Sequence, residues 1–334
     1  MTNGSSYPIF FGFNAVEVLY KRKFIYFGIE SKHTIMKNLI NKALSTMAVT
    51  AGTVIFLASC NSTGNSTTNE TAIDSASAEN LELTLTLEWK TDSSFTGSES
   101  ALYHAPNNTI YLSCGNTDPS AKDGDGFIAL LHPDGTVKEK DWVTGLDAPR
   151  GMAILNDKLY VTDIDVVRII NIETAEIEET IPVEGSVFLN DLATNGTSIF
   201  FSDSRAGIIY AMSEAGEVTS VVTGAEGVNG LECYNGDLYS LDAEGLKRFD
   251  SEYTSMLINS EITGGDGLVI LGDSTFIASR WQGEVYYING KESTLLLDTQ
   301  AEESKTADIG YIADMNLLLV PTFTKNELAA YRFE

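Results

Sequence analysis

The sequence predicts an all-β protein, a six-bladed β-propeller with four antiparallel strands per blade. Three observations support this prediction. A short motif recurs at intervals of 40, 39, 37 and 42 residues between Arg150 and Asp308. A second apolar run follows each copy, and two more strand-like runs complete each unit. Four short strands in every ~40 residues are typical of a propeller, in which ring closure protects the sheet edges.

The recurring motif places one residue, which we call the anchor, at the start of the first strand of each unit. The anchors are Glu99, Arg150, Asn190, Asn229, Asp266 and Asp308. The second strand of each later unit is expected around an apolar residue ten positions after the anchor, namely Tyr160, Phe200, Tyr239, Phe276 and Leu318. A β-sandwich or a single barrel would not explain one shared period, so we expect six blades.

The last unit, residues 308–334, has room for only three strands. The segment 81–89 can supply the fourth, because apolar residues occupy every odd position and polar residues lie between them. This alternation is typical of a half-buried strand. The N-terminal strand is therefore predicted to pair with the C-terminal blade and to close the ring.

The residues before the propeller are predicted to direct the chain to a membrane. Residues 36–59 read as a signal peptide, with two lysines followed by an uncharged stretch that ends in Leu-Ala-Ser before Cys60. This ending resembles the lipobox of bacterial lipoproteins, which implies that Cys60 carries a lipid. An uncleaved membrane helix is the alternative.

A start at Met36 makes residues 1–35 a mis-assigned N-terminal extension, although a start at Met1 stays open. Residues 60–80, rich in Ser, Thr and Asn, are expected to be a flexible tether to the domain at 81–334. We therefore expect a monomer on the periplasmic or cell-surface side of a bacterial membrane, attached only through the lipid. The sequence does not indicate which leaflet holds the lipid.

Composition excludes several classes of function. The chain has 47 acidic and 21 basic residues, a formal net charge of −26, which repels nucleic acid. Three cysteines and three histidines argue against a disulfide framework or a Cys/His zinc site, so a bound metal should have oxygen ligands. Cys114 and Cys233 fall in different blades and are expected to be free, buried thiols. The chain has no Gly-x-Ser-x-Gly motif for serine hydrolysis.

In a propeller the first strand of each blade lines the central channel, so the six anchors should form a ring around the axis. Three carboxylates, two amides and one guanidinium would then share a small volume. Facing carboxylates repel one another and raise one another's pKa. A hard divalent cation would relieve this repulsion, and Ca²⁺ accepts mixed Asp, Glu and Asn oxygens.

The motifs that begin at Glu99, Asn190-Asp191, Asn229-Gly230 and Asp266-Gly267 resemble the metal-ligand motifs of the senescence-marker-protein/gluconolactonase/regucalcin family. The resemblance covers residues 81–334. It implies a divalent metal, Ca²⁺ first among Mg²⁺, Mn²⁺ and Zn²⁺, held by Glu99, Asn190, Asn229 and Asp266. It also implies that Asp266 is the catalytic base.

The resemblance implies a metal-dependent hydrolase of a small lactone or ester, in which the metal polarises the carbonyl and activates water. The alternative is a non-catalytic propeller that binds a ligand or partner and uses the metal only structurally. Arg150 and Asp308 join the ring by register alone and are candidate substrate-binding residues.

Phe188 is a further candidate substrate-binding residue. Many members of the family carry arginine two residues before the first asparagine, where this chain has Phe188. An aromatic ring in place of a guanidinium favours alkyl-substituted lactones over gluconolactone. The alternative is that Phe188 packs within the blade and leaves the pocket unchanged.

Overall fold

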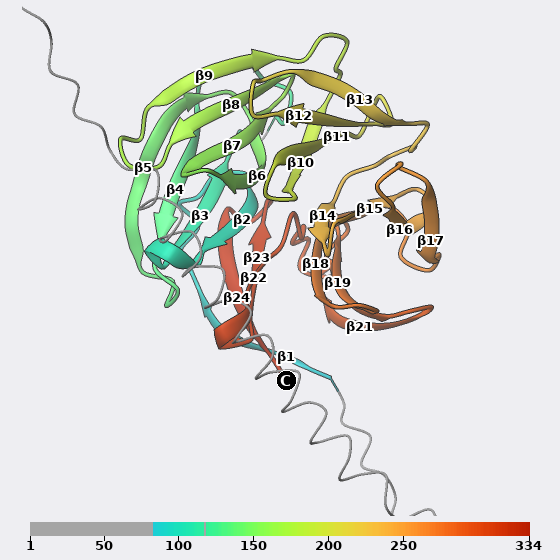
Figure 1. Ribbon diagram of the computed structural model, residues 1–334. Helices are drawn as coiled ribbons and strands as arrows, with labels where there is room; N and C mark the ends of the chain where they lie inside the picture. Colours follow the sequence, from blue (N-terminus) through green and yellow to red (C-terminus); the bar gives the residue numbers. More distant parts are fainter. Residues whose placement is uncertain (1–82, 117) are drawn as a thin grey trace, which may run out of the picture. The chain divides into compact units, whose positions relative to one another are not determined.

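The computed structural model describes residues 83–116 and 118–334 (Figure 1). The predictions for residues 1–80, including the extension, the signal peptide, the tether and Cys60, lie outside the described residues. Within the described part of the chain, no helix is both long and apolar enough to span a membrane.

The predicted six-bladed propeller is confirmed: six four-stranded antiparallel sheets follow one another along the chain. Figure 1 shows the innermost strands β2, β6, β10, β14, β18 and β22 gathered around the centre. From inside to outside, blades 1 and 2 contain β2 (Ser98–His104), β3 (Thr109–Cys114), β4 (Gly126–Leu131) and β5 (Val137–Leu146), then β6 (Pro149–Leu155), β7 (Lys158–Asp163), β8 (Val166–Asn171) and β9 (Ile177–Pro182).

Blades 3 and 4 contain β10 (Leu189–Thr194), β11 (Ser198–Asp203), β12 (Ile208–Ser213) and β13 (Val218–Thr223), then β14 (Leu231–Tyr234), β15 (Asp237–Asp242), β16 (Gly245–Phe249) and β17 (Ser255–Asn259). Blades 5 and 6 contain β18 (Gly265–Gly272), β19 (Thr275–Arg280), β20 (Glu284–Asn289) and β21 (Glu292–Asp298), then β22 (Gly310–Ile312), β23 (Leu317–Thr322), β24 (Glu327–Phe333) and β1 (Leu85–Lys90). Short 3₁₀ turns, η1 (Ala105–Asn107) and η2 (Ala313–Met315), join the first two strands of blades 1 and 6.

The hydrophobic core consists of six clusters, and each cluster lies between two neighbouring blades. Strand residues alternate between the two faces of their sheet, so every blade contributes one face to each of two clusters. The second-strand residues predicted from the sequence fall as expected: Phe200 in β11 and Phe276 in β19, for example, are buried in these clusters. This arrangement fixes the innermost strands at the axis.

Ring closure by the N-terminal strand is also confirmed. β1 pairs antiparallel with β24, from Leu85 opposite Phe333 to Lys90 opposite Ala329. The described part of this strand departs from strict alternation, because a bulge precedes Trp89 and leaves Leu87 half exposed. β1 is the outermost strand of its blade, where less of the sheet is covered.

Trp89 links the two ends of the ring. Its indole nitrogen donates to the carbonyl of Pro133, in the turn between β4 and β5 of blade 1. The ring also packs against Gly135, where an added Cβ would lie 2.6 Å from the indole. Trp89 contacts the core cluster between blades 6 and 1. Trp89 therefore connects blade 6 to blade 1 through a hydrogen bond and apolar contacts.

Buried aspartates at the end of the second strand hold the loops that precede the innermost strands. The Asp163 carboxylate accepts from the backbone nitrogens of Asp147 and Ala148 just before β6. The Asp203 carboxylate accepts from those of Val187 and Phe188 just before β10. The repeated aspartate therefore orders the loops around the anchors.

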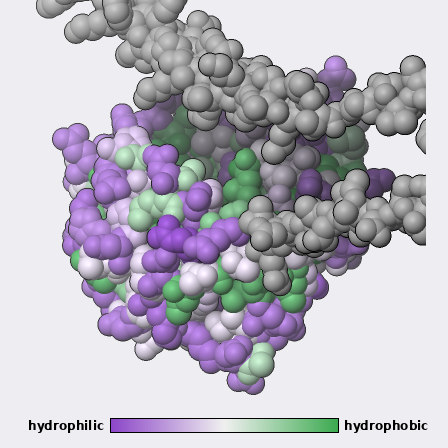
Figure 2. Space-filling view, turned by 90° about the horizontal axis from the view of Figure 1, so that it is seen from below, coloured by the Kyte–Doolittle hydropathy of each residue, from purple (hydrophilic) through white to green (hydrophobic). Residues whose placement is uncertain are grey.

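Figure 2 shows a mainly hydrophilic surface with small hydrophobic areas on the outer side of the propeller. The acidic excess of the chain is consistent with such a solvated surface.

Candidate functional site

The anchors lie where the innermost strands begin, and four of them occupy a β-bulge. In the pairing of β10 with β11, Asn190 and Asp191 fall outside the regular register. The same irregularity occurs at Glu99, Arg150 and Asp266. Bulges redirect side chains and are common beside functional sites. The repeated bulge thus explains how residues of strongly polar character reach the axis of an otherwise regular sheet.

Glycines beside the anchors allow neighbouring innermost strands to approach closely. A Cβ on Gly267 would clash with the backbone of blade 6, and one on Gly310 would clash with the Ala101 carbonyl of blade 1. The backbone nitrogen of Asp308 donates to the Glu99 carbonyl at 2.9 Å. The anchors of successive blades are therefore packed directly around the axis.

Three of the four predicted metal ligands come together. The Asn229 amide nitrogen donates to Asp266 Oδ1 at 3.0 Å. Burial raises the pKa of Asp266 well above its usual value, and the negative charge of Glu99 raises it further. The fourth, Asn190, is also buried, but its amide nitrogen donates to Ser204 Oγ at 3.0 Å.

Two buried oxygens in this group lack a hydrogen-bond partner: Glu99 Oε2 and Asn229 Oδ1. Leaving a buried acceptor unsatisfied costs about 1–3 kcal/mol, and more when the group is charged. Burial raises the pKa of Glu99, while the nearby Arg150 lowers it. Both oxygens are of the kind that Ca²⁺ accepts, so the residues present fit a hard divalent cation.

The described residues contain no group of three or more His, Cys, Asp or Glu side chains arranged to hold one metal ion. The predicted set has two carboxylates and two amides, so a metal here would depend on the amide oxygens of Asn190 and Asn229 as well. Water would complete its coordination.

Arg150 lies among these carboxylates and is 4% exposed. Its Nη1 is 3.9 Å from Glu99 Oε1, and its Nη2 donates to the Pro119 carbonyl. Its Nε–H has no acceptor. Burial lowers the pKa of the guanidinium, whereas the charges of Glu99 and Asp266 raise it. The ring therefore contains one fixed positive charge of its own.

Asp308 belongs to the same axis but faces a different space. Its Oδ2 accepts from Ser100 Oγ at 2.5 Å, and it lines a central cavity of about 310 Å³. Burial raises its pKa well above the usual value, and the negative charge of Asp191 contributes next. The structure thus places Asp308 beside the other anchors and on the cavity side of them.

Two acidic residues on the cavity were missed by the sequence predictions. Asp191 Oδ2 accepts from the backbone nitrogen of Leu231 in the next blade at 2.6 Å. Burial raises the pKa of Glu232 to about 7. The repeat could have identified Glu232. In each of the other five units the residue three positions after the anchor is apolar or aromatic, whereas in this unit it is a glutamate. Tyr103, Tyr234 and Tyr311 also line this cavity.

We expect Glu232 to make the stability of the metal-free protein depend on pH. Its pKa is raised from 4.5 to about 7 in the folded state, so the folded protein retains this proton to higher pH than the unfolded chain. The free energy of unfolding is therefore expected to fall as pH rises through this range. Glu232→Gln should raise the Tm at pH 8 and flatten the change between pH 5 and pH 8, measured by thermal unfolding in chelator.

Glu226→Gln, at an exposed position in the loop between β13 and β14, is the matched control and should leave the pH dependence unchanged. Equal pH dependence in wild type and Glu232→Gln would contradict this assignment.

Cys114 and Cys233 are both free thiols, as predicted. Cys114 is buried, but Cys233 is only partly buried, which corrects the expectation for that residue. The cause is its position in β14, where it borders the central cavity. Burial raises the pKa of Cys233 to about 12, so this thiol is not expected to be a nucleophile at neutral pH.

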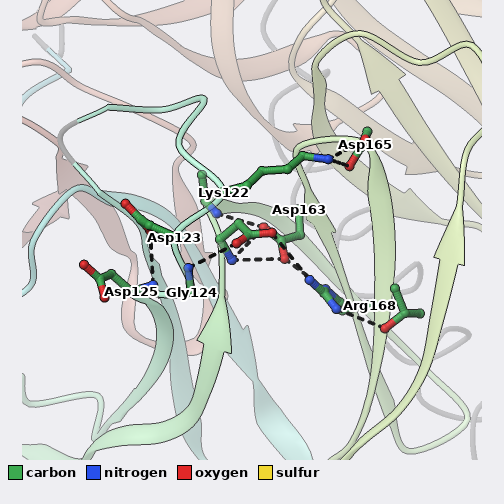
Figure 3. Close-up of polar contacts among 10 residues, drawn as sticks. Lys122, Asp123, Gly124, Asp125, Asp163, Asp165 and Arg168 are labelled. Carbon is green, nitrogen blue, oxygen red and sulfur yellow. Dashed lines mark hydrogen bonds and ion pairs between the residues drawn. The ribbon is translucent and has the colours of Figure 1, made fainter.

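The loop between β3 and β4 reaches over blade 2 (Figure 3). Lys122 forms an ion pair of 2.6 Å with Asp165, and the backbone nitrogen of Gly124 donates to Asp147 Oδ1. Pro119 of this loop accepts from Arg150, and the free space beside Arg150 and Glu99 is only about 10 Å³. Arg150 and Glu99 are therefore closely covered at the anchor end.

Phe188 lies next to Arg150. The guanidinium carbon of Arg150 is 3.8 Å from the centre of the Phe188 ring, and that of Arg205 is 4.0 Å from it. Phe188 is partly exposed, which places its ring beside the anchor group and not within the blade core. Trp281 and Phe323 pack together in other loops at this end, with ring centres 5.0 Å apart.

Comparisons with known proteins support the fold. No protein-family model matches the chain, and no curated protein is significantly similar to it. Among solved structures, a gluconolactonase-like protein has a TM-score of 0.56 at 15% identity, covering 76% of this chain and 93% of its own. A catalytically inactive virginiamycin B lyase from Staphylococcus aureus with quinupristin has a TM-score of 0.53 at 12% identity, covering 75% and 99%. A streptogramin B lyase has a TM-score of 0.52 at 11% identity, covering 76% and 98%.

Proposed function

We propose that the protein is a divalent-metal-dependent hydrolase of a small lactone or ester. The observation that supports this most is the pair of buried oxygens without partners, Glu99 Oε2 and Asn229 Oδ1, beside the Asp266 carboxylate. Glu99, Asn190, Asn229 and Asp266 would hold the metal, with Ca²⁺ the best match for an all-oxygen set. Bound there, the cation would polarise a carbonyl and lower the pKa of a water molecule.

The protein residues would divide the remaining tasks. Asp266 is the candidate base, since its second oxygen is not engaged by Asn229, whose amide holds Oδ1 in place. Arg150 has an Nε–H without an acceptor and can donate to a substrate oxygen. Phe188 is partly exposed beside Arg150, and its open edge would contact the ring or chain of the substrate. We expect alkyl-substituted lactones to react faster than gluconolactone.

Metal removal tests this proposal directly. The purified protein is expected to contain about one equivalent of a divalent metal by elemental analysis and to hydrolyse members of a lactone and ester panel. Chelation should abolish the activity, and adding Ca²⁺ should restore it. A metal-bound protein that is inactive on the whole panel would contradict the hydrolase proposal.

A non-catalytic propeller that binds a partner and uses the metal structurally is the second candidate. The observation that favours it is the close cover over Glu99 and Arg150, which leaves about 10 Å³ beside them. In that case chelation should lower the Tm, and the protein should hydrolyse no member of the panel before or after chelation.

The structural similarity to lyases does not favour a histidine-dependent reaction here. One of those neighbours is a catalytically inactive variant in which alanine replaces a histidine. In residues 83–116 and 118–334, His104 ends β2 and His132 follows β4, both at the end of the propeller opposite the anchors. No imidazole of the described chain can therefore act beside Asp266.

A further inference from the structure

Phe188 carries two guanidinium groups against one aromatic ring. The central carbons of Arg150 and Arg205 lie 3.8 and 4.0 Å from the ring centre, well within the ~6 Å of a cation–π contact. The charge of Arg205 also disfavours the charged form of Arg150 and lowers its pKa. Two like charges are thus held close together at one position of a strongly acidic chain.

Both guanidinium groups can form further hydrogen bonds. Arg205 is exposed and forms no ion pair with any carboxylate of the described residues. Arg150 is 4% exposed, yet its Nε–H has no acceptor. A buried donor without a partner is costly, so an acceptor from outside the chain would be stabilising here.

The backbone holds this group in a fixed arrangement. Asp203 Oδ1 accepts from the backbone nitrogens of both Phe188 and Arg205, at 3.1 and 3.2 Å. Its Oδ2 accepts from that of Val187 at 2.6 Å. One buried carboxylate therefore ties together the two loops that supply the ring and the exposed guanidinium. Such preorganisation lowers the entropy cost of binding.

Two exposed apolar side chains lie in loops at this end of the propeller. Val187 is 51% exposed and Trp281 is 37% exposed, in the loops that precede β10 and follow β19. Both loops lie at the end where the innermost strands begin. A ligand for this end should therefore combine an anionic group with an apolar or planar body.

We propose that Arg205, stacked on the Phe188 ring, binds the carboxylate of the substrate, while Arg150 on the axis side of that ring donates to another substrate oxygen. The identity of the ligand as a substrate rests on the proposed function, whereas the binding of a carboxylate does not. The substrate class is then a lactone or ester that bears a carboxylate on an apolar or aromatic framework. The guanidinium fork matches a carboxylate in shape, and the ring restricts its motion.

The position of the charges explains why the carboxylate binds at Arg205 and not at the axis. Glu99, Asp266 and Asp308 offset the charges of Arg150 and of a divalent cation bound there, so the channel offers an anion no net positive charge. Arg205 lies on the solvent side of Phe188, where it can pair with the anion, and the uncharged carbonyl is left to reach the anchor group.

Binding of benzoate and benzamide tests the inference without any need for catalysis. The two probes have the same planar shape and differ in charge. Calorimetry or ligand-observed NMR on the metal-loaded full-length protein should show benzoate bound about tenfold more tightly than benzamide. Arg205→Gln should remove this preference, and Arg205→Lys should retain part of it, because lysine keeps the charge without the planar fork.

Lys291→Gln is the matched control. Lys291 is exposed in the β20–β21 turn, at the end opposite the anchors, and this substitution removes the same unit of charge. It should leave the preference for benzoate unchanged. Equal binding of the two probes by wild type, no binding of benzoate, or an equal loss in Lys291→Gln would each overturn the inference.

A substrate pair then links binding to turnover. A γ-lactone bearing a carboxylate should be hydrolysed with about tenfold higher kcat/KM than its primary carboxamide, and Arg205→Gln should abolish the difference mainly through KM. Failure of both lactones to react, with the benzoate preference intact, would contradict the hydrolase proposal and leave carboxylate binding supported.

Discussion

Asp266→Asn is expected to abolish hydrolysis while the protein stays folded. The substitution removes a charged metal ligand and the candidate base together, so kcat/KM should fall by at least about 10³-fold. An asparagine oxygen can still accept the hydrogen bond from Asn229, and the side-chain volume is nearly unchanged. The variant should also lose most of its bound metal by elemental analysis.

Asp266→Asn is expected to stabilise the metal-free protein although it abolishes activity. Burial and the charge of Glu99 raise the pKa of Asp266, so the ionised carboxylate destabilises the metal-free fold at pH 8. Removing that charge is expected to raise the Tm of the metal-free protein at pH 8. Asp273→Asn, in the exposed turn before β19, is the control and should change neither property. Full activity and normal metal content in Asp266→Asn would disprove the site.

Deleting residues 81–90 is expected to cause the largest loss of stability. The deletion removes β1, exposes the edge of β24 and takes away Trp89, which contacts both blade 6 and blade 1. The free energy of unfolding should fall by at least ~4 kcal/mol, and the Tm by ~10 °C or more. An exposed strand edge should also promote aggregation.

Deletion of residues 61–75 is the control for chain shortening and should leave the Tm unchanged. Trp89→Ala separates the contribution of the side chain from that of the strand, and an intermediate Tm is expected. Equal melting temperatures for the two deletions would show that β1 does not close the ring.

The fold could be predicted because each blade repeats one local pattern. The repeat fixed the number of blades, and the alternation in 81–89 identified the closing strand. The bulge in β1 and the exposure of Leu87 could not be predicted, since they depend on how little of the outermost strand is covered. The alternation of apolar and polar residues shows that a strand has one apolar and one polar face. It does not show how deeply each face is buried.

The candidate site was predicted less completely. Register alone brought Glu99, Asn229 and Asp266 to one place, because equivalent positions of a ring meet at its axis. It did not show that Asp191 bonds to the next blade or that Arg205 reaches the Phe188 ring. The first contact joins blades 3 and 4, and the second joins two loops at one end of blade 3. Both depend on bulges and loops, whose side-chain directions the repeat does not encode.

The pairing of β1 with β24 also determines when the protein can finish folding. Glu88 and Arg332 form an ion pair across 244 residues of sequence, whereas the first five blades contain only local hairpins. Loop closure over such a length is slow and entropically costly, and it is impossible until β24 has been synthesised. Early blades can form in order, but the core between blades 6 and 1 cannot form before β24 is available. A chain truncated within β24 would lack the strand with which β1 pairs and would be left open to proteolysis.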